Sequence, residues 1–360
     1  MKNLTVVYTG EMEPSGQCYS RYLALKDIEP NVIPLDRTPY FRGSGFLLGL
    51  ELRTFYGPSY RRLNADLLSL CRKAKPDILW VDKGYWIWPS TLKSLRSQGI
   101  YLAEHNTDYL HHKTLRMRWL YYLLGKGLPY YDHYFTTNKP DFDEISKWSR
   151  RPKAHFTHLG YDNRRFHSRP LTLEEAREWS SELLFVGHHE PRTEAGIVAL
   201  IKAGLPVTVS GAGWSRATDQ AALAGRYIDR YMSGDDYVRA LKGAKIGLCF
   251  VSEYNANQTA ARSLEIPACG TFLLAMRTRQ HLDLFEEGKE AEFFENHEEL
   301  CAKAKYYLEH GDERREIARR GCQRSAQSDY SYSRYMRDDW ATLLKAFHAS
   351  RSSARSLVAV

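Results

Sequence analysis

Short apolar runs alternate with amphipathic stretches along the first half of the chain. The apolar runs have the length and composition of buried strands, and the stretches between them have helical spacing. The predicted strands are residues 4–8, 31–36, 77–82, 101–105, 133–138 and 153–160. The predicted helices are residues 17–27, 46–73, 89–98 and 139–148. This alternation is typical of a doubly wound parallel sheet, and it predicts one α/β domain over residues 1–165.

The same pattern resumes after a polar stretch at residues 161–180, which contains Pro170 and reads as an interdomain linker. The predicted strands of this half are residues 182–187, 206–211, 245–250 and 271–275, and the clearest helices are residues 233–244 and 296–309. We therefore predict a second Rossmann-like domain over residues 166–332.

Length and composition agree with two domains. The chain has 360 residues, of which 43% are apolar, and this is ample for two cores. It contains no run of about eighteen apolar residues, and its first residues read as a strand rather than as a secretory signal. Six cysteines are scattered without a C-x-x-C pair. These features predict a cytoplasmic protein with reduced, buried thiols rather than a metal site.

The net charge of +8 favours an anionic partner. Three classes fit: a nucleoside diphosphate, an anionic membrane surface, or nucleic acid. Nucleic acid is the weakest of them, because the chain has no basic repeat, zinc finger or RNA-binding aromatic signature. A basic surface without a specific partner is the plain alternative.

The stretch from Asn257 to Phe294 carries the strongest candidate site. It predicts a short helix, a stop at Gly270 and a buried strand, with Thr259 as a candidate N-cap. Arg262 and Glu265 are three residues apart, so they share one helix face. The positive charge suits a phosphate and the carboxylate suits a diol, so the pair predicts a nucleotide site. A surface ion pair is the alternative. Pro267 implies that the helix starts near Ser263 or is kinked.

This stretch also carries a resemblance. RSLEIPACGTFLLAMRT, followed by LFEEGKEAEFF, resembles the CgeB-like (spore-maturation type) glycosyltransferases. These are similar in turn to the retaining GT-B glycosyltransferases, which have a Glu-x7-Glu motif that closes on an Ala-Cys-Gly turn. The resemblance is strong from Phe185 to the end of the chain, and it rests on pattern alone before that.

The resemblance implies a fold, a donor site and a last helix. The fold is GT-B, with two Rossmann-like domains whose parallel sheets face each other across a cleft. Glu265 matches the second motif glutamate, which holds the ribose hydroxyls of the donor. The first glutamate falls at Asn257, which departs from the wider family. Residues 333–360 would form a helix that crosses back to the first domain, followed by a frayed tail.

Two further segments are candidates for donor binding. In FVGHHEPR, Gly187 ends a strand and Arg192 opens the next helix, where it would face the diphosphate. A solvated loop with a surface arginine is the alternative. In GAGW, Gly211 allows close approach of a nucleotide, and Trp214 either contributes to that site or covers the edge of the sheet.

The first domain supplies the catalytic candidates. His105 follows a strand, and in the wider family a histidine at such a place faces the donor sugar; Asp108 would orient it or meet an acceptor hydroxyl. A structural histidine is the alternative. No D-x-D pair or histidine spacing for a metal occurs, so we expect neither metal nor other cofactor. Residues 111–131 mix basic and aromatic side chains, which fits either an interfacial segment or a core helix.

The sequence thus predicts a cytoplasmic glycosyltransferase, with peripheral contact at the inner face of the membrane as an open alternative. It would move a sugar from a nucleoside-diphosphate sugar to a glycan, lipid-linked or other acceptor, with retention and without metal. A sugar-nucleotide epimerase on the same fold is one alternative. The other is an inactive GT-B module with a structural role, which the Asn257 departure keeps open.

Overall fold

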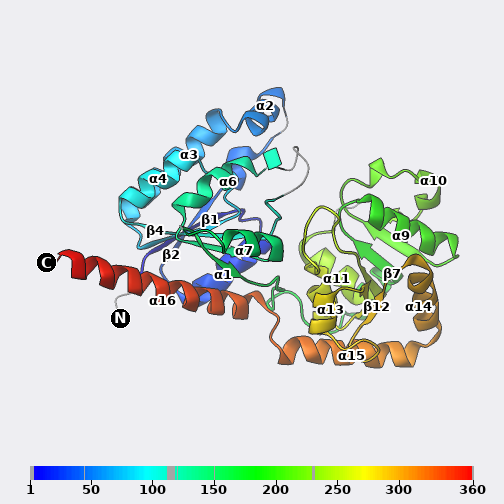
Figure 1. Cartoon of the computed structure of the whole chain (residues 1–360). Coiled ribbons are helices and arrows are strands. Elements are labelled where there is room, and N and C mark those ends of the chain that lie inside the picture. Colours follow the sequence, from blue (N-terminus) through cyan, green and yellow to red (C-terminus); the bar gives the residue numbers. More distant parts are fainter. Residues whose placement is uncertain are drawn as a thin grey trace. The chain divides into compact units, whose positions relative to one another are not determined.

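The computed structural model describes residues 4–43, 45–111, 118–119, 121–149, 151–228 and 232–358. The chain forms two compact units, one of Met1–His158 with Tyr332–Val360 and one of Leu159–Ser331 (Figure 1). The predicted boundaries were residues 165 and 332. The stretch at 161–180 is part of the second unit and not a separate linker, because Phe166 is buried against Tyr237 and Tyr161 bridges Ser331.

The first unit contains a six-stranded sheet in the order β2-β1-β3-β4-β5-β6, in which every strand pair is parallel. Its strands are β1 (Val6–Gly10), β2 (Val32–Asp36), β3 (Ile78–Asp82), β4 (Tyr101–Asn106), β5 (His133–Thr136) and β6 (Lys153–Phe156). Its helices before the second unit are α1 (Gln17–Ile28), α2 (Phe46–Thr54), α3 (Pro58–Ala74), α4 (Pro89–Ser97), α6 (Tyr122–Gly127) and α7 (Lys139–Ile145), with 3₁₀ turns η1 (Thr38–Phe41) and η2 (Leu128–Tyr130).

The single helix predicted over residues 46–73 is two helices in the structure. Helix α2 ends at Phe55, whose φ of 57° is left-handed, and Gly57 follows with a φ of 144°. Pro58 then opens α3 at a position where its missing N–H costs nothing. The local backbone chemistry of Phe55 to Pro58 therefore interrupts a pattern that looks continuous by hydrophobic spacing.

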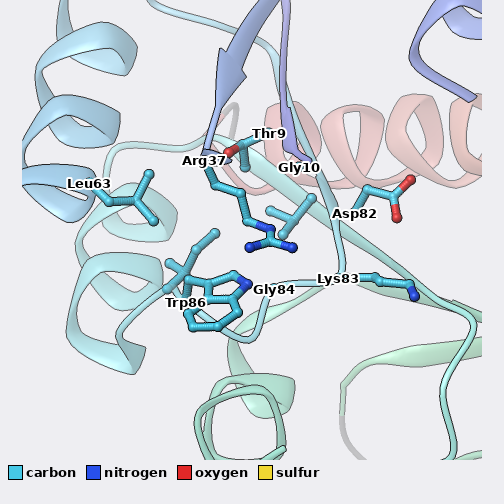
Figure 2. Close-up of a pocket in the computed structure, with 10 residues that line it drawn as sticks. Thr9, Gly10, Arg37, Leu63, Asp82, Lys83, Gly84 and Trp86 are labelled. Atoms are coloured by element: carbon cyan, nitrogen blue, oxygen red, sulfur yellow. The ribbon is translucent and has the colours of Figure 1, made fainter. Parts of the chain in front are cut away.

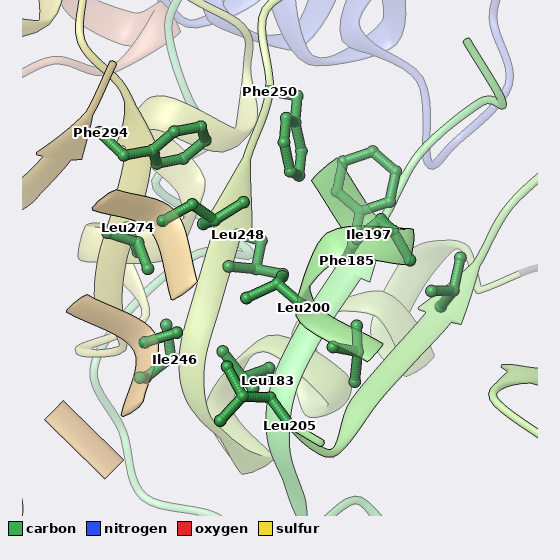
Figure 3. Close-up of a cluster of buried hydrophobic side chains, with 14 of the residues drawn as sticks. Leu183, Phe185, Ile197, Leu200, Leu205, Ile246, Leu248, Phe250, Leu274 and Phe294 are labelled. Carbon is green, nitrogen blue, oxygen red and sulfur yellow. The ribbon is translucent and has the colours of Figure 1, made fainter. Parts of the chain in front are cut away.

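The second unit has a six-stranded parallel sheet in the order β12-β11-β10-β7-β8-β9. Its strands are β7 (Ser181–Val186), β8 (Val207–Ser210), β9 (Tyr227–Ile228), β10 (Ala244–Cys249), β11 (Phe272–Met276) and β12 (Glu292–Phe294). Its helices are α8 (Leu173–Glu178), α9 (Pro191–Lys202), α10 (Gln220–Leu223), α11 (Gly234–Gly243), α12 (Arg262–Ala268), α13 (Arg279–Leu284), α14 (His297–Glu309) and α15 (Gly311–Gln327), with the 3₁₀ turn η3 (Trp214–Arg216). Leu183, Leu248 and Leu274, from three neighbouring strands, lie together in its core (Figure 3).

The last helix, α16 (Tyr332–Val358), packs on the first unit (Figure 1). Its buried face presents Met336, Trp340 and Leu343 to the apolar side chains of β1 and β3, and α1 lies beside it. Residues 348–358, predicted as a frayed tail, continue this helix.

Each sheet has one point at which the strand order reverses. In the first unit the chain turns from β1 to β2 on one side and then returns to β3 on the other, so the reversal lies between β1 and β3. In the second unit it lies between β7 and β10. In open α/β sheets, ligands bind outside the carboxyl ends of the strands at such a point. The two reversal points are therefore the places to look for sites.

Candidate functional site

At the reversal point of the second sheet, two glycines bring two loops into contact. Gly187 follows β7, and its amide donates to the carbonyl of Ser210 over 2.9 Å. Gly211 follows β8 with a φ of +135°, and a Cβ on it would overlap the carbonyl oxygen of Gly187. Gly211 is thus needed for close backbone approach, whereas a side chain on Gly187 would collide with the side chains of Phe185 and Arg262. Trp214 donates from its indole nitrogen to the Gly187 carbonyl over 2.9 Å and is only 2% exposed, so it supports this turn from within.

Arg262 spans the reversal point. A Cβ on Gly187 would lie 2.9 Å from its Nη1, and its Nη2 donates to the carbonyl of Phe250, directly after β10, over 3.4 Å. The guanidinium carbon lies 5.0 Å from the centre of the Phe185 ring. Within the described part of the chain, its buried Nε has no hydrogen-bond partner. An arginine whose Nε is unbonded within the described residues, at the carboxyl ends of the central strands, retains a donor for an anion.

Glu265 lies one turn further along α12 and is 7% exposed. The Tyr237 hydroxyl, from α11, donates to its Oε2 over 2.8 Å. Burial raises the pKa of this carboxyl, while the Tyr237 hydrogen bond and the charge of Arg262 oppose that shift. The helix spacing predicted from the sequence thus places Arg262 and Glu265 in one electrostatic environment, although they form no ion pair within the described residues.

The start of α12 confirms one of the two predicted alternatives, a helix that begins near Ser263, but the predicted N-cap is wrong. The helix begins at Arg262, and Pro267 lies in its last turn. Thr259 is not its N-cap: its hydroxyl lies 3.4 Å from the side-chain oxygen of Gln280. Instead, the Ser263 hydroxyl accepts from the amide of Ala260 over 3.0 Å.

A buried network holds α12 in place. The Ser263 oxygen lies 2.7 Å from Nε2 of His281, whose Nδ1 lies 2.6 Å from the carbonyl oxygen of Met276. Burial lowers the pKa of His281 to about 4, so the ring is neutral near pH 7. Both side chains are fully buried. Asn257 is half-buried in the loop between β10 and α12.

Arg192 is exposed in the first turn of α9, and its backbone amide is already bonded. That amide donates to Oε2 of Glu253 over 3.0 Å, and the amide of Glu253 donates to Glu190 over 2.7 Å. The carboxylate of Glu253 therefore occupies the position at which the sequence suggested a diphosphate. Only the side chain of Arg192 remains a candidate for contact with a donor.

The reversal point of the first sheet has a small pocket (Figure 2). Thr9 and Gly10 line it from the end of β1, and Asp82 to Gly84 line it from the end of β3. The guanidinium of Arg37 lies over the ring of Trp86, with 4.8 Å to the ring centre, and pairs with Glu11 over 2.5 Å. We did not predict Arg37 or Trp86 from the sequence. The only signal was that Arg37 directly follows an apolar strand.

His105 is in the core of the first unit and not at its surface. It is 2% exposed and its ring stacks on Trp80 at 6.4 Å. Burial lowers its pKa to about 3, and the positive charge of Arg21 adds to that shift. Arg21 forms a fully buried ion pair with Asp82 over 2.7 Å. In this structure the imidazole is a neutral core group, so its predicted contact with a donor sugar is without geometric support.

Asp108 occupies a different environment from His105. Its Oδ2 lies 3.0 Å from Nζ of Lys83 and accepts from the Tyr85 hydroxyl over 2.5 Å. The side chains of Asp108 and Lys83 are 20% and 25% exposed. Lys83 has a φ of 58°, which is uncommon for a residue other than glycine and marks a constrained turn after β3. Asp108 and Lys83 are therefore the accessible charged pair at the ends of β3 and β4.

Residues 111–131 have features of both predicted alternatives, an interfacial segment and a core helix. Residues 112–117 and 120 lie outside the described residues. Leu123, Leu124 and Leu128 are buried, whereas Trp119 and Tyr122 are 51% and 42% exposed. Among the residues that the structure describes, no group of His, Cys, Asp and Glu is arranged to hold a metal, and no helix is both long and apolar enough to cross a bilayer.

Comparisons with known proteins bear on the fold and on the second unit. Residues 192–338 match the sequence profile of a family described as "Glycosyl transferase-like". A comparison with curated proteins found no significant match. The matched segment contains α12 with Arg262 and Glu265, and it begins at Arg192.

Several solved structures are similar in fold to nearly the whole chain, although their sequence identity to it is low. A sucrose-phosphate synthase from Thermosynechococcus elongatus has a TM-score of 0.66 and 12% identity, with 96% of this chain and 100% of that chain covered. Anabaena HepE in complex with UDP and glucose has a TM-score of 0.62 and 12% identity, with 95% and 100% covered. A protein from Listeria monocytogenes described as a putative UDP-N-acetylglucosamine 2-epimerase has a TM-score of 0.61 and 12% identity, with 96% and 97% covered. The chain has the GT-B fold.

Proposed function

We propose that this protein is a glycosyltransferase that takes a sugar from a nucleoside-diphosphate sugar, with the donor bound by the second unit. The observation that carries this proposal is Arg262, which lies at the reversal point of the second sheet with a buried, unpartnered Nε within the described residues. The glycosyltransferase-like profile over residues 192–338 supports it. So do the similar structures that contain UDP, and UDP is therefore the first nucleotide to test.

The donor would be held by residues from three loops of the second unit. Arg262 binds the diphosphate, and the Gly187–Gly211 contact lets the nucleotide approach the backbone. Glu265 accepts from the ribose hydroxyls. Asn257 takes the place of the carboxylate that the wider family uses for the sugar, since an amide both donates and accepts. The side chain of Arg192 and the hydroxyl of Thr259 complete our proposed donor site.

The acceptor would be bound by the first unit. The pocket with Arg37 and Trp86 lies at the reversal point of its sheet and holds only about 10 Å³, so it would contact one group of the acceptor and not enclose it. Lys83, which lines this pocket, is paired with Asp108. We propose that Asp108 orients an acceptor hydroxyl, with Lys83 setting its position. His105 is buried in the core, and we propose that it makes no contact with the acceptor or the sugar. The acceptor is a glycan or a lipid-linked sugar.

We propose that transfer proceeds with retention and without metal. The bond between the anomeric carbon and the diphosphate breaks, the acceptor oxygen bonds to the same face of that carbon, and the proton of the acceptor hydroxyl passes to the leaving diphosphate. The leaving diphosphate gains negative charge, and the guanidinium of Arg262 neutralises it. The anomeric configuration of the product, read from its proton coupling constant by NMR, tests retention directly.

Nucleotide binding to an Arg262→Met variant tests the donor site. Charged hydrogen bonds contribute about 1.5–3 kcal/mol, so we expect affinity for the tightest of UDP, GDP, CDP and dTDP to fall roughly tenfold to a hundredfold. The matched control is Arg279→Met, whose side chain is 82% exposed on α13. Equal binding by wild type and Arg262→Met contradicts the assignment, as does an equal loss in the control.

An epimerase is the second candidate, because one similar structure is described as a putative UDP-N-acetylglucosamine 2-epimerase. The two activities differ in their need for an acceptor. Conversion of a nucleotide sugar to its epimer in the absence of any acceptor favours the epimerase. Release of the nucleoside diphosphate that depends on added acceptor favours the transferase. If the protein binds no nucleotide, the remaining alternative is an inactive GT-B module with a structural role.

A further inference from the structure

Most of the exposed apolar side chains of the described residues gather on one surface of the first unit. Twelve large hydrophobic residues are exposed, and seven of them lie on α2, just after it, or on the segment that packs against it. We call these seven the α2 surface; they are Phe46, Leu47, Leu50, Leu52, Tyr56, Trp119 and Tyr122. Phe46 and Leu47 are 82% and 74% exposed. A concentrated exposed apolar patch usually marks an interaction site.

Helix α2 buries a carboxylate and exposes most of its apolar side chains, the opposite of the usual arrangement in a globular protein. Its one buried residue is Glu51, a carboxylate, while its phenylalanine and most of its leucines face outward. Glu51 accepts from the amide of Ser59 over 3.0 Å, at the positive end of α3. A Cβ on Gly57 would overlap the Glu51 side chain, so glycine is required for this contact. An acidic anchor thus holds the helix with its apolar face outward.

Aromatic contacts fix the rest of the α2 surface. The indole nitrogen of Trp119 donates to the carbonyl of Arg53 over 2.9 Å, and its ring stacks on Tyr122 at 5.3 Å. Phe55, which is buried, contacts both rings at 5.2 and 6.0 Å. The patch is therefore a preformed surface made by two segments that are distant in sequence.

The charges around the α2 surface are positive. From Arg42 to Arg62 the chain has four arginines and one acidic residue, and that residue is the buried Glu51. All four arginines are exposed. On the second segment, Arg118 and Lys126 are exposed as well, and no acidic residue lies between them. Two copies of this surface would repel each other if they met face to face, so the charge disfavours self-association.

We propose that the α2 surface binds a membrane surface that contains anionic lipids. Phenylalanine and leucine would enter the boundary between headgroups and acyl chains, tryptophan and tyrosine would lie at the headgroup level, and the arginines would face lipid phosphates. A membrane with anionic lipids fits both features of the α2 surface. An apolar partner alone would not need the arginines. An acidic protein alone would not need Phe46 and Leu47 to be exposed.

The α2 surface is continuous with the pocket of Figure 2 inside the first unit. Phe55, Tyr60 and Leu123 form a buried cluster, and Trp86, which lines the pocket, packs against it. Tyr60 and Trp86 have ring centres 5.9 Å apart. If the pocket holds the acceptor, as proposed above, membrane binding brings that pocket to lipid-linked acceptors. This last step rests on the proposed function; the membrane contact itself does not.

Vesicle sedimentation tests the contact with the full chain and without nucleotide or acceptor. We expect the protein to bind vesicles of phosphatidylcholine with 30% phosphatidylglycerol at least about tenfold more tightly than pure phosphatidylcholine, and less tightly at high salt. The double variant Phe46→Ser, Leu47→Ser should lose most of this binding. Leu173→Ser is the matched control, since Leu173 is also 82% exposed but lies on the second unit.

A charge variant separates the two contributions. Arg42→Ser with Arg53→Ser should reduce the preference for anionic vesicles, whereas Arg319→Ser on α15 should leave it unchanged. Thermal melts check that all variants are folded. Equal sedimentation of wild type and the Phe46, Leu47 variant overturns the proposal. The proposal is also overturned if analytical ultracentrifugation without vesicles finds that the wild type is a dimer and that the Phe46, Leu47 variant is a monomer. Neither outcome depends on glycosyl transfer.

Discussion

Replacing Asp339 with asparagine should stabilise the protein at alkaline pH and leave it unchanged in acid. Asp339 lies on α16, is 8% exposed, and accepts a hydrogen bond from the Thr157 hydroxyl over 2.9 Å. Burial raises its pKa from 3.8 to about 7; the Thr157 hydrogen bond and the charge of Arg21 oppose the shift, and the charge of Asp338 adds to it. The folded protein therefore keeps a proton on Asp339 that the unfolded chain releases near pH 4.

The magnitude follows from this difference in pKa. Between about pH 4 and pH 7 the folded state binds more protons than the unfolded state, so stability falls as the pH rises through that window. Three pKa units correspond to about 4 kcal/mol in the free energy of unfolding. This stabilisation is present below about pH 4 and is lost by about pH 7. Asparagine keeps an oxygen for Thr157 and carries no charge to bury. We expect Asp339→Asn to gain about 2–4 kcal/mol at pH 8, which raises the Tm of a unit this size on the order of 5–10 °C.

Calorimetric melts of wild type and variant from pH 4 to pH 8 measure this gain as a difference curve. Other carboxylates titrate in both proteins, so only the difference reports on Asp339. Asp338→Asn is the matched control, because that side chain is 63% exposed on the same helix and should give a small, nearly constant difference. A Tm difference that does not grow between pH 4 and pH 8, or an Asp339→Asn protein that is less stable at pH 8, refutes the reasoning.

Four further outcomes test the sites. Gly211→Ala should lower both Tm and nucleotide affinity because its Cβ meets the Gly187 carbonyl, whereas Gly204→Ala, with a φ of +77° and no neighbour within 4 Å, should cost only the backbone strain; equal effects on thermal melts contradict the close approach. Glu265→Gln should weaken nucleoside diphosphate binding by roughly tenfold with little change in Tm, and titration calorimetry that finds no loss removes the ribose assignment. His105→Asn should lower Tm while folded protein keeps its turnover; a large loss of turnover at unchanged Tm restores the predicted catalytic role. Activity should survive excess EDTA, and loss that magnesium or manganese reverses sinks the metal-independent mechanism.

The amino-acid sequence by itself determined most of the strands and helices and one part of the candidate site. Strand and helix periodicity are local properties, so the alternation along the chain is sufficient to predict two parallel α/β units. The spacing of Arg262 and Glu265 is local as well, and so is the glycine that ends β7. What local spacing could not supply was how α12 is anchored. Thr259 is not its N-cap, and the Ser263–His281 contact that holds the helix joins residues from two different helices.

Only the tertiary structure decided which candidate side chains are buried and which are accessible. His105 and Asp108 are three residues apart, yet one is in the core beside Asp82 and the other is paired with Lys83, because that choice depends on neighbouring strands. The pocket at Arg37 and the outward face of α2 were also invisible to periodicity. In α2 the buried side chain is the carboxylate of Glu51, which accepts from the amide of Ser59 in α3, a residue that the periodicity of α2 does not contain.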